Sequence, residues 1–102
     1  MKSFGEIIRQ ARQERKLILG KVGAELNIDQ AIISKFERGE RKPTKDQALR
    51  FAKFYNLDED DIIIAWLSDK IICDLENEIL AKEALKAAEH RIRHNELKAL
   101  KK

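Results

Sequence analysis

The residues whose types and spacing suit a specific chemistry lie in the stretch DQAIISKFERGERK, from Asp29 to Lys42. Asp29 is a residue type that commonly caps a helix, and Gly39 favours the left-handed backbone that ends one. The short helix predicted between them carries an amide, Gln30, and a base, Lys35, on its outer face. Such a helix fits the major groove of DNA, where amide and ammonium groups hydrogen-bond to base edges. The basic pair that closes the stretch suits the neighbouring phosphates.

Two predicted helices precede this stretch. Ser3 and Glu6 form the pattern of a capping box, and apolar residues at helical spacing extend the first helix to about Lys16. A second, short helix is predicted over residues 19–26. Asn27 can take the left-handed conformation that ends this helix. Gly23 is unfavourable inside a helix, so its presence predicts a close approach by another helix.

Three more helices are predicted after the stretch. Thr44 and Gln47 form a second capping box, and Asn56 ends the helix that it begins. Asp58 caps the next helix, whose first turn is acidic and therefore favourably placed at the positive end of the helix dipole. The last helix is predicted from about Glu78 to Leu97 or beyond.

Length, composition and charge agree with an all-helical chain that binds a polyanion through its first half. The 102 residues suit one domain with an appendage, and four Gly and one Pro disfavour a turn-rich β fold. Residues 1–56 hold 13 Lys and Arg against 7 Asp and Glu, whereas residues 57–102 hold 8 against 11. The basic half therefore favours a nucleic-acid partner. The single cysteine, Cys73, is expected to be a buried, unreactive thiol.

Two short helices joined by about three residues form a helix-turn-helix pattern. Residues 4–67 resemble the Xre/Cro-type helix-turn-helix family of lambda-repressor-like regulators. The residues that carry this resemblance are Val22-Gly23, Leu26-Asn27-Ile28, Ile33-Ser34-Lys35-Phe36-Glu37-Arg38-Gly39, Lys42-Pro43-Thr44, Leu49, Ala52 and Leu57. The resemblance implies an all-α fold, with a five-helix DNA-binding domain over residues 1–67 and an additional helical extension over residues 68–102.

The resemblance also implies which residues contact double-stranded DNA. Gln30, Ala31 and Lys35 match base-facing positions and suit an adenine, a thymine methyl group and a guanine, respectively. Contacts to phosphates or to the groove edge are expected from Lys21, Ser34, Arg38, Arg41, Lys42 and Thr44. Glu37 matches an acidic position that pairs with an arginine of the first helix, so a structural ion pair with Arg12 is expected.

The chain departs from the family pattern at the start of the second helix. A Ser or Thr usually caps that helix and a Gln follows, whereas this chain has Ile18 and Leu19. The usual contact of that Gln with the DNA backbone is therefore lost. Lys21, or a free amide of the first turn, is expected to replace it.

The C-terminal residues predict a dimer. The segment IIIAWL, residues 62–67, is apolar on every side, and such a helix must be buried on more than one face. One face can cover the N-terminal core, and the other requires a further helix or a second chain. Dimerisation is expected through Ile63, Trp66, Leu67, Ile71, Leu75, Leu85, Ala88 and Ile92. The alternative is that the last helix packs on the preceding helix of its own chain.

No residue pattern supports an enzyme, a cofactor or a metal site. His90 and His94 share a helix face but lack further ligands, and the acidic run from Asp58 to Asp61 lacks the glycine and spacing of a calcium loop. No apolar run is long enough to span a membrane, and the short chain leaves no room for a small-molecule domain. A cytoplasmic, nucleoid-associated protein is therefore expected.

Two functions from different classes follow. The first is a transcriptional regulator that binds a pseudo-palindromic operator as a homodimer and controls its own gene. The segment WLSDKI followed by an alanine-rich helix resembles controllers found beside DNA methyltransferase genes in restriction–modification systems. The second is an antitoxin whose C-terminal helix binds a protein partner, with DNA binding secondary. A C-terminal helix that folds only on its partner would distinguish the second function.

Overall fold

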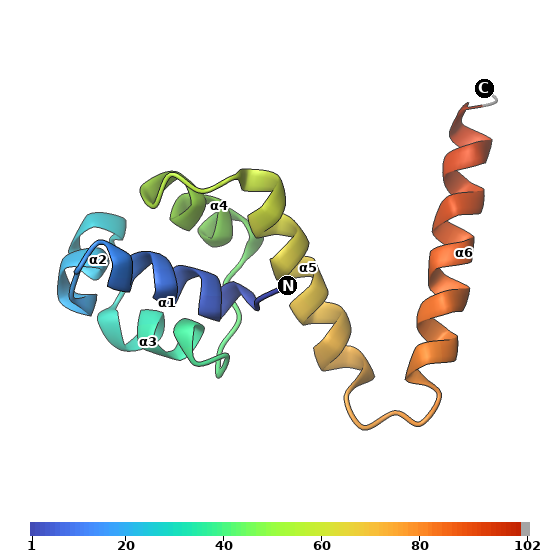
Figure 1. The fold of residues 1–102 in the computed structure, drawn as a ribbon, viewed down its shortest axis with the longest axis horizontal. Coiled ribbons are helices and arrows are strands. Elements are labelled where there is room, and N and C mark those ends of the chain that lie inside the picture. The colour runs from blue at the N-terminus through green and yellow to red at the C-terminus, as the bar shows by residue number, and fades with distance from the viewer. Residues whose placement is uncertain (101–102) are drawn as a thin grey trace. The chain divides into compact units, whose positions relative to one another are not determined.

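A computed structural model describes residues 1–100, which form six helices and no strand (Figure 1). The helices are α1 (Phe4–Glu14), α2 (Leu19–Leu26), α3 (Gln30–Glu37), α4 (Lys45–Phe54), α5 (Glu59–Leu75) and α6 (Ala81–Leu100). The predicted all-α fold is thus confirmed: five helices and an additional C-terminal one. The chain divides into an N-terminal unit, Met1–Ile71, and a C-terminal unit that begins at Ile72. No helix among the described residues is long and apolar enough to cross a membrane.

Side chains cap the helices where the sequence predicted caps. The Ser3 and Thr44 hydroxyls accept hydrogen bonds from the backbone N–H groups of Glu6 and Gln47, and both capping boxes are complete. Asp29 caps α3 by accepting from the Ala31 N–H at 2.7 Å, and an Asp58 oxygen accepts from the backbone of α5. These bonds satisfy amides that have no partner inside the helix.

The first four helices share one way of ending. In each, a residue with positive φ follows the last turn, and the next residue donates its N–H to a carbonyl five residues back. The left-handed residues are Lys16, Asn27, Gly39 and Asn56. Asn27 and Gly39 were predicted to end their helices. The first helix was predicted to run to about Lys16, and α1 ends two residues earlier, at Glu14, because Lys16 is left-handed (φ 55°) and the chain leaves the helix there.

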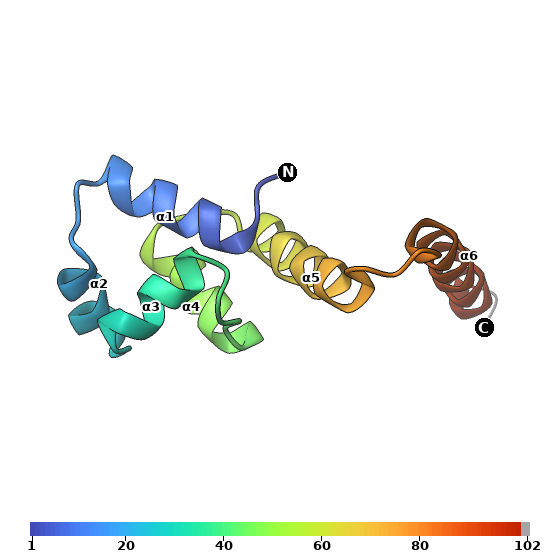
Figure 2. The same cartoon turned by 90° about the horizontal axis from the view of Figure 1, so that it is seen from below.

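The core of the N-terminal unit is centred on Phe51, which is fully buried. Its ring meets the rings of Phe4 and Phe36 edge-on at 5.8 and 6.1 Å and stacks with Tyr55 at 6.3 Å. Around this cluster α3 packs against α1 and α2, and α2 also contacts α4 (Figure 1 and Figure 2). The aromatic cluster therefore links the first, third and fourth helices through side chains of one type.

Two polar contacts attach the first part of α5 to this core. The Phe4 N–H donates to Asp69 Oδ2 at 3.0 Å, and the indole N–H of Trp66 donates to the Pro43 carbonyl at 2.8 Å. Ile62 and Ala65 are buried on the same helix. No described side chain after Ala65 is buried. The expectation that Cys73 is buried was therefore wrong, since its side chain is exposed.

The C-terminal unit contains the end of α5, a turn and α6. Asn77 is left-handed (φ 66°), and the Glu78 N–H donates to the Leu75 carbonyl at 3.1 Å. The last helix was predicted to begin at about Glu78, and α6 begins three residues later, at Ala81. The turn explains the difference, because it uses residues 76–80 before the Ala84 N–H makes its 2.9 Å bond to the Leu80 carbonyl.

Candidate nucleic-acid interface

A close backbone approach fixes the angle between α2 and α3. A Cβ placed on Gly23 would lie 2.7 Å from the carbonyl oxygen of Ile28 and 3.4 Å from the backbone nitrogen of Gln30. Because the obstructing atoms belong to the backbone, a side chain at Gly23 would force the turn between the helices to move. The predicted close approach is thus present, and the atoms that approach are those of the turn and the first residue of α3.

The outer face of α3 presents the residues that were predicted to read bases. Gln30, Ala31 and Lys35 are all exposed, and Ser34 is half-buried between them. A Cβ on Gly20 would lie 3.1 Å from Gln30 Oε1, so this amide leans toward the first turn of α2. The loop that follows α3 adds exposed Arg41, Lys42 and Thr44, and exposed Lys21 lies on α2. The nine predicted contact residues therefore lie on consecutive segments of one unit.

Several of these side chains already have partners within the protein. Lys21 forms an ion pair with Glu25 at 3.3 Å, and Lys42 Nζ donates to the Asp69 carbonyl at 3.4 Å. The Thr44 hydroxyl is the cap of α4. Arg38 forms a shorter ion pair than Lys21, because its Nη2 lies 2.6 Å from Glu40 Oε2.

Glu40 is an acidic residue of this surface that was not among the predicted site residues. Its hydrogen bond with Arg38 lowers the pKa of the Glu40 carboxyl and raises the pKa of the Arg38 guanidinium. Lys35 also lowers the pKa of Glu40 through its charge. The carboxylate therefore lies within the field of two residues that were predicted to contact DNA, and it stays ionised at neutral pH.

The start of α2 has no side-chain cap. Ile18 occupies the cap position with 73% of its surface exposed, and no side chain accepts a hydrogen bond from the first turn. This geometry follows from the apolar residue at a position where the family usually has a hydroxyl. Unbonded amides at a helix start are suited to an anion such as a phosphate.

A buried ion pair joins α1 to the end of α3. Arg12 donates from Nε to Glu37 Oε2 at 2.8 Å and from Nη2 to Oε1 at 3.0 Å, and its Nη1 donates to the Leu17 carbonyl at 3.0 Å. The two side chains are only 16% and 5% exposed. The bond to Glu37 raises the pKa of Arg12 in spite of the burial. Because the contact is bidentate, it fixes the direction of α3 relative to α1.

Sequence reasoning missed two contacts that support the helix-turn-helix, one at the end of α3 and one at the end of α2. A Cβ on Gly5 would lie 2.7 Å from the carbonyl oxygen of Glu37 and closer still to that of Phe36, so α1 and the last turn of α3 touch through their backbones. Arg50 donates to the carbonyl of Leu26 at the end of α2. A glycine in a first helical turn and an arginine on a helix face are both common, so neither gave a distinguishing signal.

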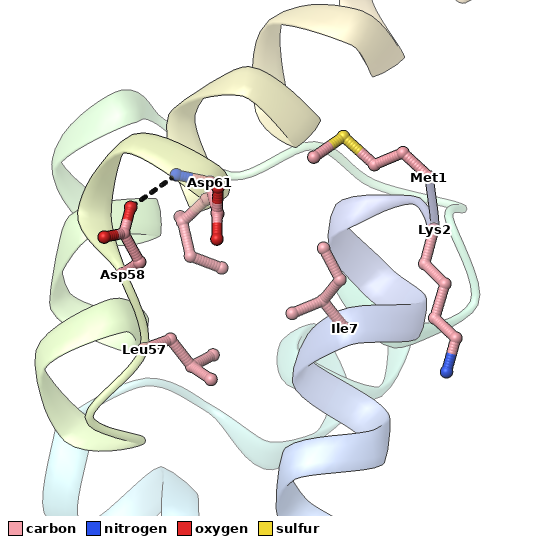
Figure 3. Close-up of a pocket in the computed structure, with 7 residues that line it drawn as sticks. Met1, Lys2, Ile7, Leu57, Asp58 and Asp61 are labelled. Atoms are coloured by element: carbon pink, nitrogen blue, oxygen red, sulfur yellow. Dashed lines mark hydrogen bonds between the residues drawn. The ribbon is translucent and has the colours of Figure 1, made fainter.

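A hollow of about 370 Å³ lies elsewhere on the N-terminal unit, between the starts of α1 and α5 (Figure 3). It is lined by Met1, Lys2, Ile7, Leu57, Asp58, Asp61 and Ile62. None of the predicted DNA-contact residues lines it, and its two carboxylates oppose a phosphate. One of them, Asp58, already accepts the Asp61 N–H at 3.0 Å. The hollow is therefore separate from the candidate interface.

The residues predicted for dimerisation differ in how much of them remains free. Ile63 and Trp66 are half-buried, and both lie on the first part of α5. Exposed side chains among the predicted set are Leu67, Ile71, Leu85, Ala88 and Ile92, and Leu75 is half-buried.

Among the described residues, no cluster of three or more His, Cys, Asp or Glu can hold a metal ion.

Comparison with known proteins identifies a family for this arrangement of helices. A family described as helix-turn-helix matches residues 8–62, which is more than half of the chain and includes α2, the turn and all of α3. No curated protein and no solved structure matches the chain.

Proposed function

We propose that this chain, which belongs to the helix-turn-helix family, is a transcriptional regulator that binds a pseudo-palindromic operator as a homodimer. The observation that carries the proposal is the exposed face of α3. Gln30, Ala31 and Lys35 are exposed on it, while Ile33 and Phe36 on the opposite face are buried. Because its buried face packs on the core, α3 can enter a major groove while the rest of the unit stays folded.

The roles of the contact residues follow from their chemistry. A Gln amide can bond adenine through a donor and an acceptor, a methyl side chain can contact thymine, and an ammonium group can donate to guanine. Gln30, Ala31 and Lys35 supply these three groups. The phosphate or groove-edge residues are Lys21, Ser34, Arg38, Arg41, Lys42 and Thr44. Phosphate contacts set the register, and base contacts supply the sequence preference.

Dimerisation is supported by the apolar side chains that the chain leaves uncovered. Ile72, Leu85 and Ile92 are 67%, 46% and 60% exposed. Monomers rarely expose large contiguous apolar patches, so such residues favour an interface. A single helix-turn-helix module also reads few base pairs, and two copies on half-sites about one helical turn apart read more. We therefore assign dimerisation to residues 62–95.

A finer assignment of the function rests on the sequence resemblance alone. Control of its own gene, in the manner of a restriction–modification controller, is proposed because the segment WLSDKI and the alanine-rich helix resemble such regulators. The uncovered side chains of α6 favour a second candidate as well, an antitoxin whose α6 binds a protein partner. In that case the apolar residues would cover a different protein and DNA binding would be secondary.

The first test is a salt-titrated gel shift with footprinting on the DNA upstream of the gene for this protein. Two protected half-sites about one helical turn apart, retained in the presence of competitor DNA, are expected for an operator-binding dimer. Diffuse binding that disappears as salt is added would contradict the proposal, because only the polyanion would then be recognised. Sedimentation at high protein concentration supplies a second criterion, since a species of 11.9 kDa would exclude the dimer.

Variants of the surface separate reading from attraction. The double variant Gln30→Ala with Lys35→Ala should reduce discrimination between operator and mutated operator, because each good base contact is worth about 1–3 kcal/mol. Arg41→Ala should weaken binding to all sequences and make the salt dependence less steep by about one contact. Lys53→Ala is the matched control, since Lys53 is an exposed base of α4 outside the predicted set. Unchanged discrimination in the double variant would refute the choice of base readers.

A further inference from the structure

The acidic residue Glu40 lies inside a surface that otherwise suits DNA. We propose that its carboxylate competes with DNA phosphates for Arg38 and thereby limits the affinity of the protein for duplex DNA of any sequence. The inference rests on the proposed function only in that this surface binds DNA. It concerns a residue that was not among the predicted contacts and gives it a role opposite to theirs.

The end of α3 determines where Glu40 lies. Gly39 adopts φ 73°, and the Glu40 N–H then donates to the Lys35 carbonyl at 2.9 Å. This hydrogen bond brings the backbone of Glu40 back beside the last turn of the helix. The carboxylate is therefore placed next to the recognition face by the turn itself.

The carboxylate engages Arg38 as a phosphate oxygen would. Glu40 Oε2 accepts from Arg38 Nε at 2.9 Å and from Nη2 at 2.6 Å. The remaining terminal nitrogen, Nη1, donates to Ser34 Oγ. An arginine that contacts DNA uses the same donors toward an anionic oxygen. A phosphate must therefore displace Glu40 before Arg38 can bind it fully.

Helix stability gives no reason for a carboxylate at this position. The C-terminal end of a helix carries partial negative charge, so an acidic residue there is unfavourable. The side chains of Arg38 and Glu40 are 50% and 54% exposed, and exposed ion pairs contribute little to folding. Removing the charge of Glu40 should therefore leave the melting temperature unchanged while altering the electrostatics of the surface.

The test compares the wild type with E40Q on a random-sequence duplex across a range of salt concentrations. E40Q keeps the size of the side chain and frees Arg38, so binding should become several-fold tighter. The slope of log affinity against log salt should steepen by about 0.9, the value for one added phosphate contact. The advantage of E40Q should consequently grow about threefold between about 200 mM and about 50 mM salt. An unchanged slope would overturn the proposal.

Two controls exclude simpler explanations. E89Q makes the same change in net charge, and it likewise removes a carboxylate that is paired with an arginine, since Glu89 lies 3.4 Å from Arg93 on α6 and neither residue is among the predicted contacts. An equal effect of E89Q would mean that net charge alone matters, and the proposal would fall. In the R38A background, E40Q should have no further effect. If it still tightened binding as much as in the wild type, Glu40 would act by repelling DNA directly.

The same data keep the inference apart from the proposed function. An operator footprint from the wild type together with an unchanged slope for E40Q would refute the competition and leave the regulator intact. A steeper slope without any footprint would support the competition and refute sequence-specific binding. Circular dichroism of each variant shows that the fold is retained before affinities are compared.

Discussion

The two units of this chain treat apolar side chains in opposite ways. In the N-terminal unit the large apolar residues before α5 are buried or half-buried, except Met1 and Ile18, and on α5 the exposed ones are Ile64, Leu67 and Ile71. From Ile72 onward no described side chain is buried, and Ile79 is 95% exposed. The first unit therefore has a core of its own, and before α5 it offers mainly polar side chains to a partner. The second offers apolar residues to a partner.

This difference shows what each unit needs in order to be stable. The N-terminal unit has capped helices, a buried ion pair and an aromatic cluster, all made within one chain. Most helical stability in proteins comes from the packing of an apolar face, and no described side chain of α6 is buried, so α6 needs another surface. We expect the stability of the first unit to be independent of protein concentration, and the helicity of the second to depend on it.

The largest expected effect comes from making the same kind of truncation in each unit. Phe51→Ala removes the ring at the centre of the aromatic cluster and should cost about 3–5 kcal/mol of unfolding free energy. For a domain of this size, that corresponds to a fall of roughly 12–40 °C in melting temperature. Ile92→Ala should leave this transition unchanged in dilute solution and weaken self-association. Circular dichroism and fluorescence of Trp66, the single tryptophan, at two protein concentrations measure both effects.

One result would remove the contrast. If Ile92→Ala lowered the melting temperature of dilute protein by an amount comparable to Phe51→Ala, Ile92 would belong to the core of the first unit. The C-terminal residues would then be a structural part of the DNA-binding domain, and the free apolar surface that supports a dimer would not exist.

A second, smaller effect concerns Tyr55, whose hydroxyl is buried without a hydrogen-bond partner among the described residues. Burial, together with the negative charge of Glu37, raises the pKa of Tyr55 from 10.0 to about 12. Because burial disfavours the tyrosinate, the unfolded chain loses this proton before the native protein does, so the free energy of unfolding falls as pH rises from 10 through 12. The loss should be about 2–3 kcal/mol, and Tyr55→Phe should abolish it. At neutral pH the same variant should be neutral or slightly more stable, since no hydrogen bond is removed.

Tyr55 is the only tyrosine, so the ultraviolet absorbance of tyrosinate reports its titration directly. Denaturant unfolding at several alkaline pH values, with wild type and Tyr55→Phe side by side, isolates its share from that of the lysines. Titration of Tyr55 near its ordinary pKa would show that water reaches the hydroxyl. The interior of the first unit around Tyr55 would then be more accessible to water than the burial of this residue indicates.

The sequence was informative where local chemistry decides the structure. Ser3, Asp29 and Thr44 cap helices because their short polar side chains reach the free amides, and this pattern is visible without a structure. Asn27 and Gly39 end helices for a similarly local reason. The helix-turn-helix, and the face of α3 that points outward, follow from these signals together with the apolar spacing.

Features that depend on contacts across the fold escaped prediction. Gly5 gave no signal, because the backbone carbonyls that exclude a side chain there come from α3. Glu40 was not predicted as part of the site, because the sequence does not show that its carboxylate pairs with Arg38. The burial of Cys73 was expected from apolar neighbours in sequence, yet Ile71 and Ile72 are exposed and Leu75 is only half-buried. An apolar pattern predicts a helix face that needs a partner and does not identify the partner.

The smallest expected effect is found by comparing two left-handed residues that are not glycine, one in each unit. Lys16 (φ 55°) ends α1, and Asn77 (φ 66°) follows α5. A left-handed residue with a side chain costs about 1–2 kcal/mol, and glycine avoids this cost but loses more entropy on folding. Lys16→Gly should therefore stabilise the N-terminal unit by about 0.5–1 kcal/mol. Asn77→Gly should leave its unfolding unchanged, because Asn tolerates this conformation and lies in the other unit. Denaturant titration followed by circular dichroism measures both, and a shift from Asn77→Gly as large as that from Lys16→Gly would show that the two units unfold together.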